Sequence, residues 1–490
     1  MLPTEFECIA ALARLRFREF VVADADGLLI PELLSAHELV EHFVRETGRG
    51  MLQVFADVRA EQAMAGRDPC PSCGGRMEAL RRNFWEHGTL LGAILVPDPV
   101  AYCRRCHEQA RPARSMLGTD QETWSLPVQE AAVDLATDES CQKAVAKLER
   151  HHPGVKIGRT TALRMIHCHG PRARTFINGK IAAAAARGRA GEVPTSVAEE
   201  LEVEYDASLI PVATLVPIVV PPGDEPKRTP IRKLKVRRKK VGWQEAKAGL
   251  AQKPRGKDGR KPLPGEVIRL YSVRPTEALD EAFEDLFGLA CLMGWTPSTE
   301  VRGLADGARY IRPRMEKAFE DGPFKFILDR PHCKEHLSDA GDALELLTGE
   351  EAQTWAASAL VKLEDGRTSE VVDELRAAWL TSGDDEATRN DVLRVEAGYF
   401  DWNKDAVAYA DYRDRGWSTA SGEIESFHRH GVQARVKISG AWWHPAGVDD
   451  ILALRTLKAN GWWDEYWSLQ RQQWRTRAAG FGRPLAAAAA

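Results

Sequence analysis

The chain lacks long hydrophobic runs. No stretch of eighteen uncharged apolar residues occurs in its 490 residues, and its start lacks the basic segment of a secretory signal peptide. A membrane-spanning helix needs about 20 apolar residues, so we expect a protein that neither crosses a membrane nor is exported. An excess of positive charge is also missing, because 67 basic residues face 71 acidic residues and give a net charge of −4. The length favours roughly three domains. Because we expect neither membrane insertion nor export, we expect the protein in the cytoplasm.

Cysteine is scarce, with nine residues, yet four of them form two close pairs, Cys70 with Cys73 and Cys103 with Cys106. Two Cys-x-x-Cys pairs can bring four thiolates to the corners of a tetrahedral zinc site, and residues 74–102 between them can form the hairpin of a zinc ribbon. Because the protein supplies all four ligands, such a Zn²⁺ would be structural. His107 is an alternative ligand, and chance spacing or disulfide pairing is the alternative interpretation.

Three short amphipathic patterns follow one another between residues 119 and 196. Their apolar residues recur at helical spacing, and Pro153 and Gly154 mark a turn before the third pattern. Such a series is typical of a helix-turn-helix domain. Its recognition helix would run from Gly158 to His169 and would present to DNA the side chains of Arg159, Thr160 and Arg164. A small helical bundle without a DNA-binding role is the alternative interpretation.

The basic residues are distributed unevenly. Residues 227–261 contain fifteen lysines and arginines but only two acids, Glu245 and Asp258, a local excess of thirteen (15 minus 2). Such a segment can contact DNA phosphates, and the side chains that we expect to do so are Arg237, Arg238, Lys239 and Lys240. A solvated loop is the alternative interpretation.

Three aspartates occur where a sheet would present them. Asp206 continues an alternating strand pattern, Asp306 follows an apolar segment, and Asp329 follows the apolar run at 324–328. A further acid, Glu425, lies in a segment with apolar residues at helical spacing. Carboxylates that come together need cations between them, and oxygen ligands suit Mg²⁺ or Mn²⁺, two of which can promote phosphoryl transfer. Taken alone, each acid can also be a helix cap or a solvated turn residue.

Six sequence blocks occur in an order that resembles a known family. They are CPSC with CRRCH, WQEAKAG, ADGARYI, LDRPHCKEHL, YFDWNKDAVAYADYRDRGWSTASGEIES, and GAWWHPAG with ILALR and WWDEYW. In this order they resemble the ISKra-type insertion-sequence transposases, which belong with the Mutator-like enzymes among the DDE transposases. The similarity extends from about Cys70 to Trp467, and its most specific portion is the block from Tyr399 to Trp443.

The resemblance implies an RNase H-like α/β core in which Asp206, Asp306 and Glu425 form the acid triad that binds Mg²⁺ or Mn²⁺. Asp329 and His332 would match the D-x-x-H pair that the family carries beside its site.

The chain departs from the family pattern at two positions. Ala207 stands where glycine is usual, and Tyr310 stands where tryptophan is usual. Glu423 lies two residues from Glu425, but residues at this spacing point to different sides of a helix, and the motif favours Glu425. Glu423 is then a solvated helix residue.

The function that the resemblance implies is transposition, with binding of terminal inverted repeats, Mg-dependent DNA cleavage and strand transfer. The partner would be double-stranded DNA in the nucleoid of a bacterial cell, bound by a homodimer or higher oligomer. Arg429, Arg435 and Lys437 would contact phosphates, unless they are solvated helix charges. The alternatives are a non-catalytic DNA-binding regulator derived from a transposase and a nuclease without strand transfer.

The fold class that we expect is an RNase H-like α/β core with an all-α insertion, preceded by smaller modules. The expected segments are an N-terminal helical arm at 1–66, a zinc ribbon at 67–118, a helix-turn-helix domain at 119–196, the first half of the RNase H-like core at 197–342 with a basic insertion at 222–262, an all-helical insertion at 343–415, and the second half of the core with C-terminal helices at 416–485.

Overall fold

The computed structural model describes residues 33–480 together with Ala11 and Leu15. The exceptions within this range are 82, 120–122, 218–236, 255–261, 264, 274–277, 349–350, 382–386 and 439–440. Much of the predicted basic insertion and most of the N-terminal 32 residues therefore lie outside the described residues. The chain divides into two units, one made of residues 1–131, 146–157 and 471–490, the other of residues 132–145 and 158–470.

The first unit combines one long helix with two small sheets. Helix α2 (Leu33–Ala65) lies beside the hairpin of β2 (Phe84–Thr89) and β3 (Gly92–Pro97), where Ala56 packs against Ile94 and Val96. The second sheet is antiparallel, with strands in the order β1 (Met77–Arg81), β4 (Val100–Cys103) and β5 (Gln109–Ala110). The short helix α3 (Pro112–Leu117) contacts α2.

Three helices cross the division between the units, and these are α4 (Leu126–Asp138), α5 (Cys141–His151) and α17 (Trp463–Gly480). The next helix, α6 (Arg159–Arg189), is 31 residues long and contains the predicted recognition helix only as its first portion. The helix continues through Gly170 and Pro171, and Gly170 packs closely against Asp450. A Cβ at Gly170 would lie 2.4 Å from the Cβ of Asp450.

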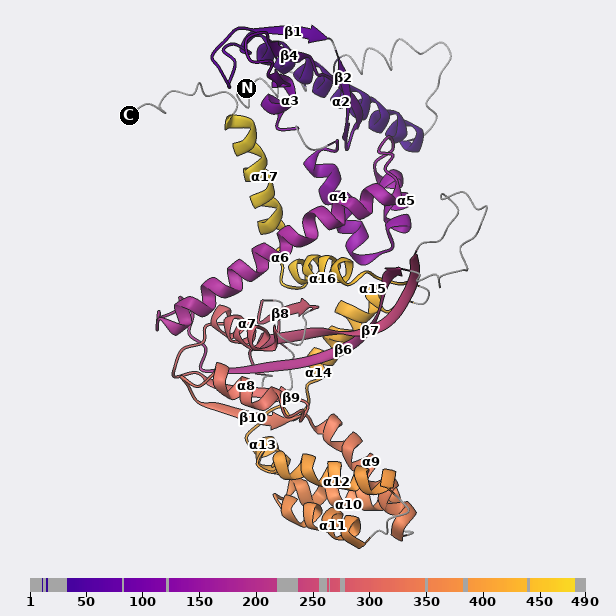
Figure 1. Ribbon diagram of the computed structural model, residues 1–490, viewed down its shortest axis with the longest axis vertical. Coiled ribbons are helices and arrows are strands. Elements are labelled where there is room, and N and C mark those ends of the chain that lie inside the picture. Colours follow the sequence, from indigo (N-terminus) through magenta and orange to yellow (C-terminus); the bar gives the residue numbers. More distant parts are fainter. Residues whose placement is uncertain are drawn as a thin grey trace, which may run out of the picture. The chain divides into compact units, whose positions relative to one another are not determined.

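A five-stranded sheet forms the centre of the second unit (Figure 1). Its order is β10 (Phe324–Leu328), β9 (Glu300–Ala305), β6 (Glu200–Pro217), β7 (Arg237–Gln252) and β8 (Val267–Ser272). β9 and β10 run parallel to β6, whereas β7 pairs antiparallel with both β6 and β8. The fold is therefore mixed α/β.

Helices cover both faces of this sheet. On one face lie α7 (Leu279–Leu292) and α8 (Ile311–Ala318), and Phe283 of α7 packs there on Tyr205 with ring centroids 4.7 Å apart. On the other face lie α14 (Gly422–Phe427), the π-helical segment η4 (His428–Gln433), α15 (Ala434–Val436) and α16 (Pro445–Ala459). Their apolar side chains bury even-numbered residues of β6 and β7 such as Ile210 and Leu250. Even-numbered side chains of β6 therefore face α14.

The described residues between β10 and α14 form helices and no strands (Figure 1). These helices are α9 (Arg330–Thr348), α10 (Ala352–Glu364), α11 (Thr368–Thr381), α12 (Ala387–Trp402) and α13 (Tyr409–Asp414). Helix α9 begins directly after β10, so this helical insertion is joined to the sheet without a long loop. None of the helices that the structure describes is long and apolar enough to span a lipid bilayer.

Candidate active site

Three aspartates lie in one row across the parallel strands. The pairing of β6 with β9 ends at Glu204 beside Leu304, so Asp206 and Asp306 each follow the last paired residues by two positions, and the charge of Asp306 acts on Asp206. The pairing of β9 with β10 continues in the same way to Asp306 beside Asp329. Side chains in register on neighbouring strands share a face of the sheet, so the row lies on the face that α14 covers. The prediction that these acids lie on or directly after strands is confirmed.

Asp206 is partly buried on β6. Its Oδ1 accepts a hydrogen bond from the backbone N–H of Ala207 at 2.7 Å, and its Oδ2 lies 3.4 Å from Nε2 of His428. Burial raises the pKa of Asp206 against the opposing charges of His428 and His332, and the charge of Asp306 adds to the rise. A carboxyl in this setting gains from a nearby cation.

His428 is a residue of this site that sequence reasoning misses. Its side chain is buried, and neither ring nitrogen has a hydrogen-bond partner among the residues that the structure describes. Burial lowers the pKa of His428, although Asp206 opposes the effect. His428 lies three residues after Glu425 on the same helical segment, and this spacing is the only signal in the sequence that could have indicated it.

Asp329 is buried and uses both carboxylate oxygens locally. Its Oδ2 accepts hydrogen bonds from Nδ1 and the backbone N–H of His332 at 2.7 and 3.2 Å, and its Oδ1 accepts one from the backbone N–H of Ser421 at 2.6 Å. Burial alone would raise the pKa of Asp329, but these bonds leave it below its ordinary value. The bond to Asp329 raises the pKa of His332 to about 9, with further contributions from Asp206 and Asp306. His332 is therefore a cation at neutral pH among three aspartates.

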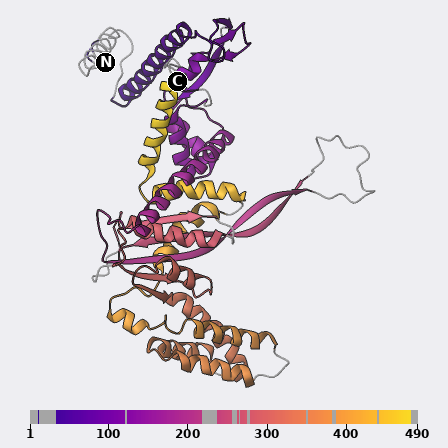
Figure 2. The same ribbon diagram turned by 60° about the vertical axis from the view of Figure 1, so that its left-hand side comes forward.

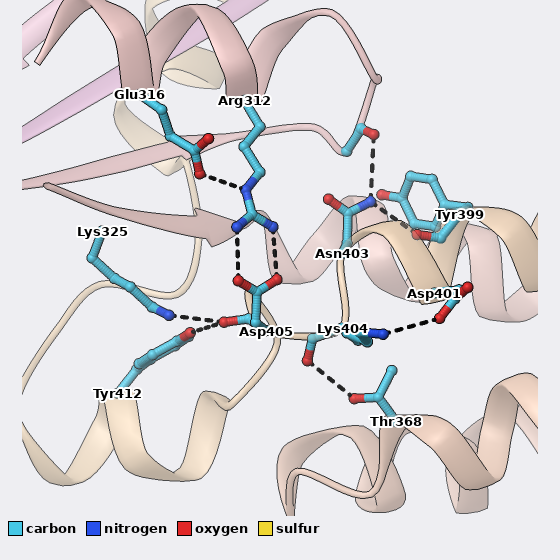
Figure 3. A network of polar contacts seen from close by, with 11 residues as sticks. Arg312, Glu316, Lys325, Thr368, Tyr399, Asp401, Asn403, Lys404, Asp405 and Tyr412 are labelled. Atoms are coloured by element: carbon cyan, nitrogen blue, oxygen red, sulfur yellow. Dashed lines mark hydrogen bonds and ion pairs between the residues drawn. The ribbon is translucent and has the colours of Figure 1, made fainter. Parts of the chain in front are cut away.

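The turn after Asp306 is supported by the helical insertion. Asp306 Oδ1 accepts a hydrogen bond from the backbone N–H of Ala308 at 2.7 Å. Nδ2 of Asn403 donates to the carbonyl oxygens of Gly307 at 3.4 Å and Tyr399 at 3.0 Å (Figure 3). A Cβ on Gly307 would lie 2.4 Å from the ring of Tyr399 and 2.5 Å from the amide nitrogen of Asn403, so glycine is required for this close approach. Tyr399 and Asn403, at the two ends of the segment 399–403, thus contact the turn after Asp306 and support it.

A second contact ties the end of the insertion to the sheet. Both outer nitrogens of Arg312 donate to the carboxylate oxygens of Asp405 at 2.7 Å, a bidentate geometry that fixes orientation as well as distance (Figure 3). The carbonyl oxygen of Asp405 accepts hydrogen bonds from Lys325 Nζ at 2.8 Å and Tyr412 Oη at 3.3 Å. Because Arg312 lies on α8 and Lys325 on β10, Asp405 fastens the returning chain to both elements.

Two buried glutamates of β6 anchor the segment that leads into α14. Ser418 Oγ donates to Glu202 at 2.9 Å, and the backbone N–H of Ile424 donates to Glu204 at 2.8 Å. Gln252 Nε2 donates to Glu204 at 3.0 Å. Burial raises the pKa of Glu204 well above its ordinary value, although the bond from Ile424 opposes this. Sequence reasoning misses this role, whose only signal is that both glutamates share one strand face with Asp206.

Glu425 lies on a helix, as predicted, but its side chain is exposed, whereas Glu423 is half-buried. Within the portion of the chain that the structure describes, one group of three or more histidines, cysteines or acids has ligand atoms within 4.8 Å of one another, and it does not include these acids. Asp206, Asp306 and Glu425 therefore do not fit a single Mg²⁺ or Mn²⁺ ion as they are placed.

That one group consists of the four predicted zinc ligands, Cys70, Cys73, Cys103 and Cys106. The sulfurs of Cys70 and Cys106 are 3.5 Å apart, as are those of Cys73 and Cys103. Zinc–sulfur bonds of about 2.3 Å in a tetrahedron require sulfurs at similar separations, so the cluster fits a structural Zn²⁺. In the cluster without an ion, a backbone hydrogen bond from Cys106 lowers the pKa of Cys103 to about 7. A backbone hydrogen bond from Glu108 lowers the pKa of Cys106, but the contacts with Cys73 and Cys70 and burial outweigh it and raise this pKa to about 12.

His107, the alternative ligand, is not a member of this group. Its Nδ1 contacts the hydroxyl of Tyr102, and its backbone has a positive φ of 64°. The turn after Cys106 therefore directs His107 towards a neighbouring strand residue.

The side chains predicted to contact DNA differ in their exposure. Those that are exposed are Arg159, Thr160, Arg164, Lys239, Lys240, Arg429 and Lys437. Arg435 departs from the prediction, because it is 3% exposed, donates to the carbonyl oxygen of Ala136 at 3.1 Å and lies 4.7 Å from the ring centroid of Trp443. Arg435 is therefore a core residue. The side chains of Arg237 and Arg238 lie outside the described residues.

A comparison of the chain with models of known protein families finds no match, and a search of curated proteins finds none either. The residues and their geometry are therefore the basis for inferring function.

Proposed function

We propose that this chain is a DDE-type transposase with an RNase H-like core, as the six ordered sequence blocks imply. The observation that carries the proposal is the row of Asp206, Asp306 and Asp329 on or directly after three parallel strands. A mixed sheet with Asp206 on β6 and Asp306 directly after β9, followed by a late helix with Glu425, supports this proposal.

The proposal gives each residue of the row a separate task. Asp206 and Asp306 would hold Mg²⁺ or Mn²⁺, whose charge supports phosphoryl transfer. Asp329 holds the protonated ring of His332, and this cation offsets the repulsion between the aspartates in the protein without an ion. Glu425 does not fit the same ion as placed, so its assignment depends on the sequence motif alone.

The substrate would be double-stranded DNA, with transposon ends and target held by at least a dimer in a bacterial nucleoid. Exposed Arg159 and Arg164 at the start of α6 and the exposed lysines of β7 would contact its phosphates. The zinc cluster would be structural, since its four ligands leave no open position.

The decisive experiment measures cleavage of DNA that carries the gene's own flanking sequence, with Mg²⁺ or Mn²⁺ and the purified full chain. Asp306→Asn should abolish cleavage and leave binding in a mobility-shift assay nearly intact, because it removes one carboxylate without changing the surface. An Asp306→Asn variant with full metal-dependent cleavage would remove this residue from the site.

Glu425 and Glu423 offer a matched pair within one helix. Glu425→Gln should reduce cleavage to background, whereas Glu423→Gln should retain it. The reverse result would reassign the third acid to Glu423.

The exposed position of Glu425 favours one alternative function, a DNA-binding regulator derived from a transposase. Such a protein would bind the flanking repeats without metal-dependent cleavage. A nuclease without strand transfer would cleave them but would fail to join a pre-cut end to a plasmid.

A further inference from the structure

The outer portions of β6 and β7, residues 207–217 and 237–246, form a two-stranded arm (Figure 2). β9 pairs with β6 only as far as Glu204, and β8 pairs with β7 only from Lys247 onward. The arm thus continues past its neighbouring strands and leaves the sheet as a ribbon.

The two faces of the arm differ. Even-numbered residues of β6, such as Ile210, lie in the core beneath α14 and α15. The odd-numbered residues of both strands face away from this core, and four large apolar side chains are exposed there: Leu209 at 53%, Leu215 at 65%, Val241 at 44% and Trp243 at 62%. Exposed apolar side chains that gather on one surface mark an interaction site.

Cations and a second tryptophan complete this surface. Lys239 Nζ lies 4.1 Å from the ring centroid of Trp442, which is 48% exposed, and Lys437 Nζ lies 5.9 Å from that of Trp243. The segment that carries Trp442 is fixed along the arm, because the backbone N–H of Ala213 donates to the carbonyl oxygen of Trp443 at 2.8 Å. We call this surface the bare face, and it consists of Leu209, Leu215, Lys239, Val241, Trp243, Lys437 and Trp442.

We propose that the bare face is a contact surface for double-stranded DNA. A two-stranded ribbon fits into the major groove of B-DNA. Lysines at its border reach phosphates, and the tryptophans and aliphatic side chains contact sugars and base edges. This inference rests on the proposed function, since both require duplex DNA as the ligand, and it adds the element that enters the groove.

Charge favours DNA over a second copy of the chain as the occupant. Lys239 and Lys437 are exposed cations at this surface, whereas the acid on the same face, Glu245, is paired with Lys247 at 3.2 Å. A two-fold contact would bring together two copies of the same lysine-bearing surface, so it would bury positive charge against a surface of like charge. A polyanion instead meets complementary charge and gains affinity by releasing counterions.

The test measures binding of the full chain to a short duplex of unrelated sequence, by fluorescence anisotropy at several salt concentrations. Trp243→Ala with Trp442→Ala should weaken binding by about 10-fold or more, since buried aromatic anchors carry much of an interface's affinity. Trp402→Ala is the matched control, because Trp402 on α12 is 43% exposed and lies outside the arm. Lys239→Gln should instead reduce the slope of log affinity against log salt by about one.

Unchanged affinity in the double tryptophan variant, with an unchanged salt slope for Lys239→Gln, overturns the inference but leaves the proposed function standing, because the parent still binds DNA. A parent chain that binds no duplex DNA overturns both. A parent that is dimeric without DNA and becomes monomeric in the double variant, as seen by sedimentation velocity, assigns the bare face to a second copy and also overturns the inference.

Discussion

The cysteine cluster and the carboxylate row differ in how completely they are assembled. All four sulfurs lie within 4.8 Å of one another, whereas the three candidate ion-binding acids share no such group. Cys70 and Cys73 lie before β1, and Cys103 and Cys106 lie at and after the end of β4, which pairs with β1, so the geometry of one small sheet sets their spacing. The acids come from β6, β9 and α14, spread over more than two hundred residues, and their charges repel one another. A local motif brings its ligands together by itself, while a distributed one depends on the rest of the fold.

That dependence is visible in the supports of the carboxylate row. Asn403 and Tyr399 hold the turn after Asp306, and His332 supplies a positive charge beside it. These supports come from the helical insertion. Changes far from the acids should therefore affect the row, whereas the zinc cluster should respond only to its own surroundings.

The largest effect is expected from breaking the assembled cluster with Cys103→Ser. Cys103 is buried and contributes to a core of few residues, so the small sheet has little else to stabilise it. We expect the variant to lose its bound zinc, as measured by inductively coupled plasma mass spectrometry, and to be cleaved rapidly by proteases within residues 67–118. Cys291→Ser, which lies outside the cluster, is the control and should keep its zinc. A Cys103→Ser variant with a full equivalent of zinc would contradict the assignment.

A smaller effect is expected from Gly307→Ala, which disturbs the packing of the turn after Asp306 against Tyr399 and Asn403. The added methyl group would collide with Tyr399 and Asn403, and overpacking of this kind lowers the free energy of unfolding by about 2 kcal/mol. Urea denaturation measures the change. Gly179→Ala on α6 is the matched control, because a Cβ there meets nothing within 4 Å and alanine favours a helix. Equal stability of the two variants would show that the turn does not depend on α12.

The smallest effect concerns the cation of the row. The pKa of His332 in the folded protein, about 9, lies above its ordinary value of about 6.5, so its protonated form stabilises the fold. This contribution is complete below about pH 6.5 and is lost as the pH rises through about 9. Partial exposure limits it to about 1 kcal/mol.

Urea denaturation between neutral and alkaline pH checks this expectation. The parent should lose more stability over this range than His332→Gln, and Asp329→Asn should reduce the same difference because it removes the hydrogen-bonded carboxylate. Parallel pH profiles for the parent and His332→Gln would exclude His332 as the cation of the row.

The sequence was sufficient for some of these features and insufficient for others, for identifiable reasons. Cysteine spacing predicts the grouping that the structure has, because a Cys-x-x-Cys turn fixes its own geometry. The alternation of Glu202 and Glu204 with apolar residues is typical of a strand with one solvent-facing side. Both glutamates are nevertheless buried, because α14, which lies more than two hundred residues further along the chain, covers that side of the strand. Contacts of this range have no signature in a local pattern.

His428 and Arg435 show the same limit. A helical pattern predicts which residues share a face, but it does not predict what that face meets. His428 meets Asp206, and Arg435 meets the carbonyl oxygen of Ala136. The sequence alone therefore does not show whether a polar residue on a predicted helix is exposed or buried, because this depends on which other element packs against the helix.

Helix α9 begins one residue after Asp329 and carries His332 in its first turn. One turn later, Nδ1 of His336 lies 2.7 Å from a carboxylate oxygen of Glu396, and its ring stacks on Tyr399, so these contacts join α9 to α12. Helix α9, nineteen residues long, therefore extends from the end of β10 into the helical bundle. The aspartates and the helical bundle are therefore connected through a single turn of α9, between His332 and His336.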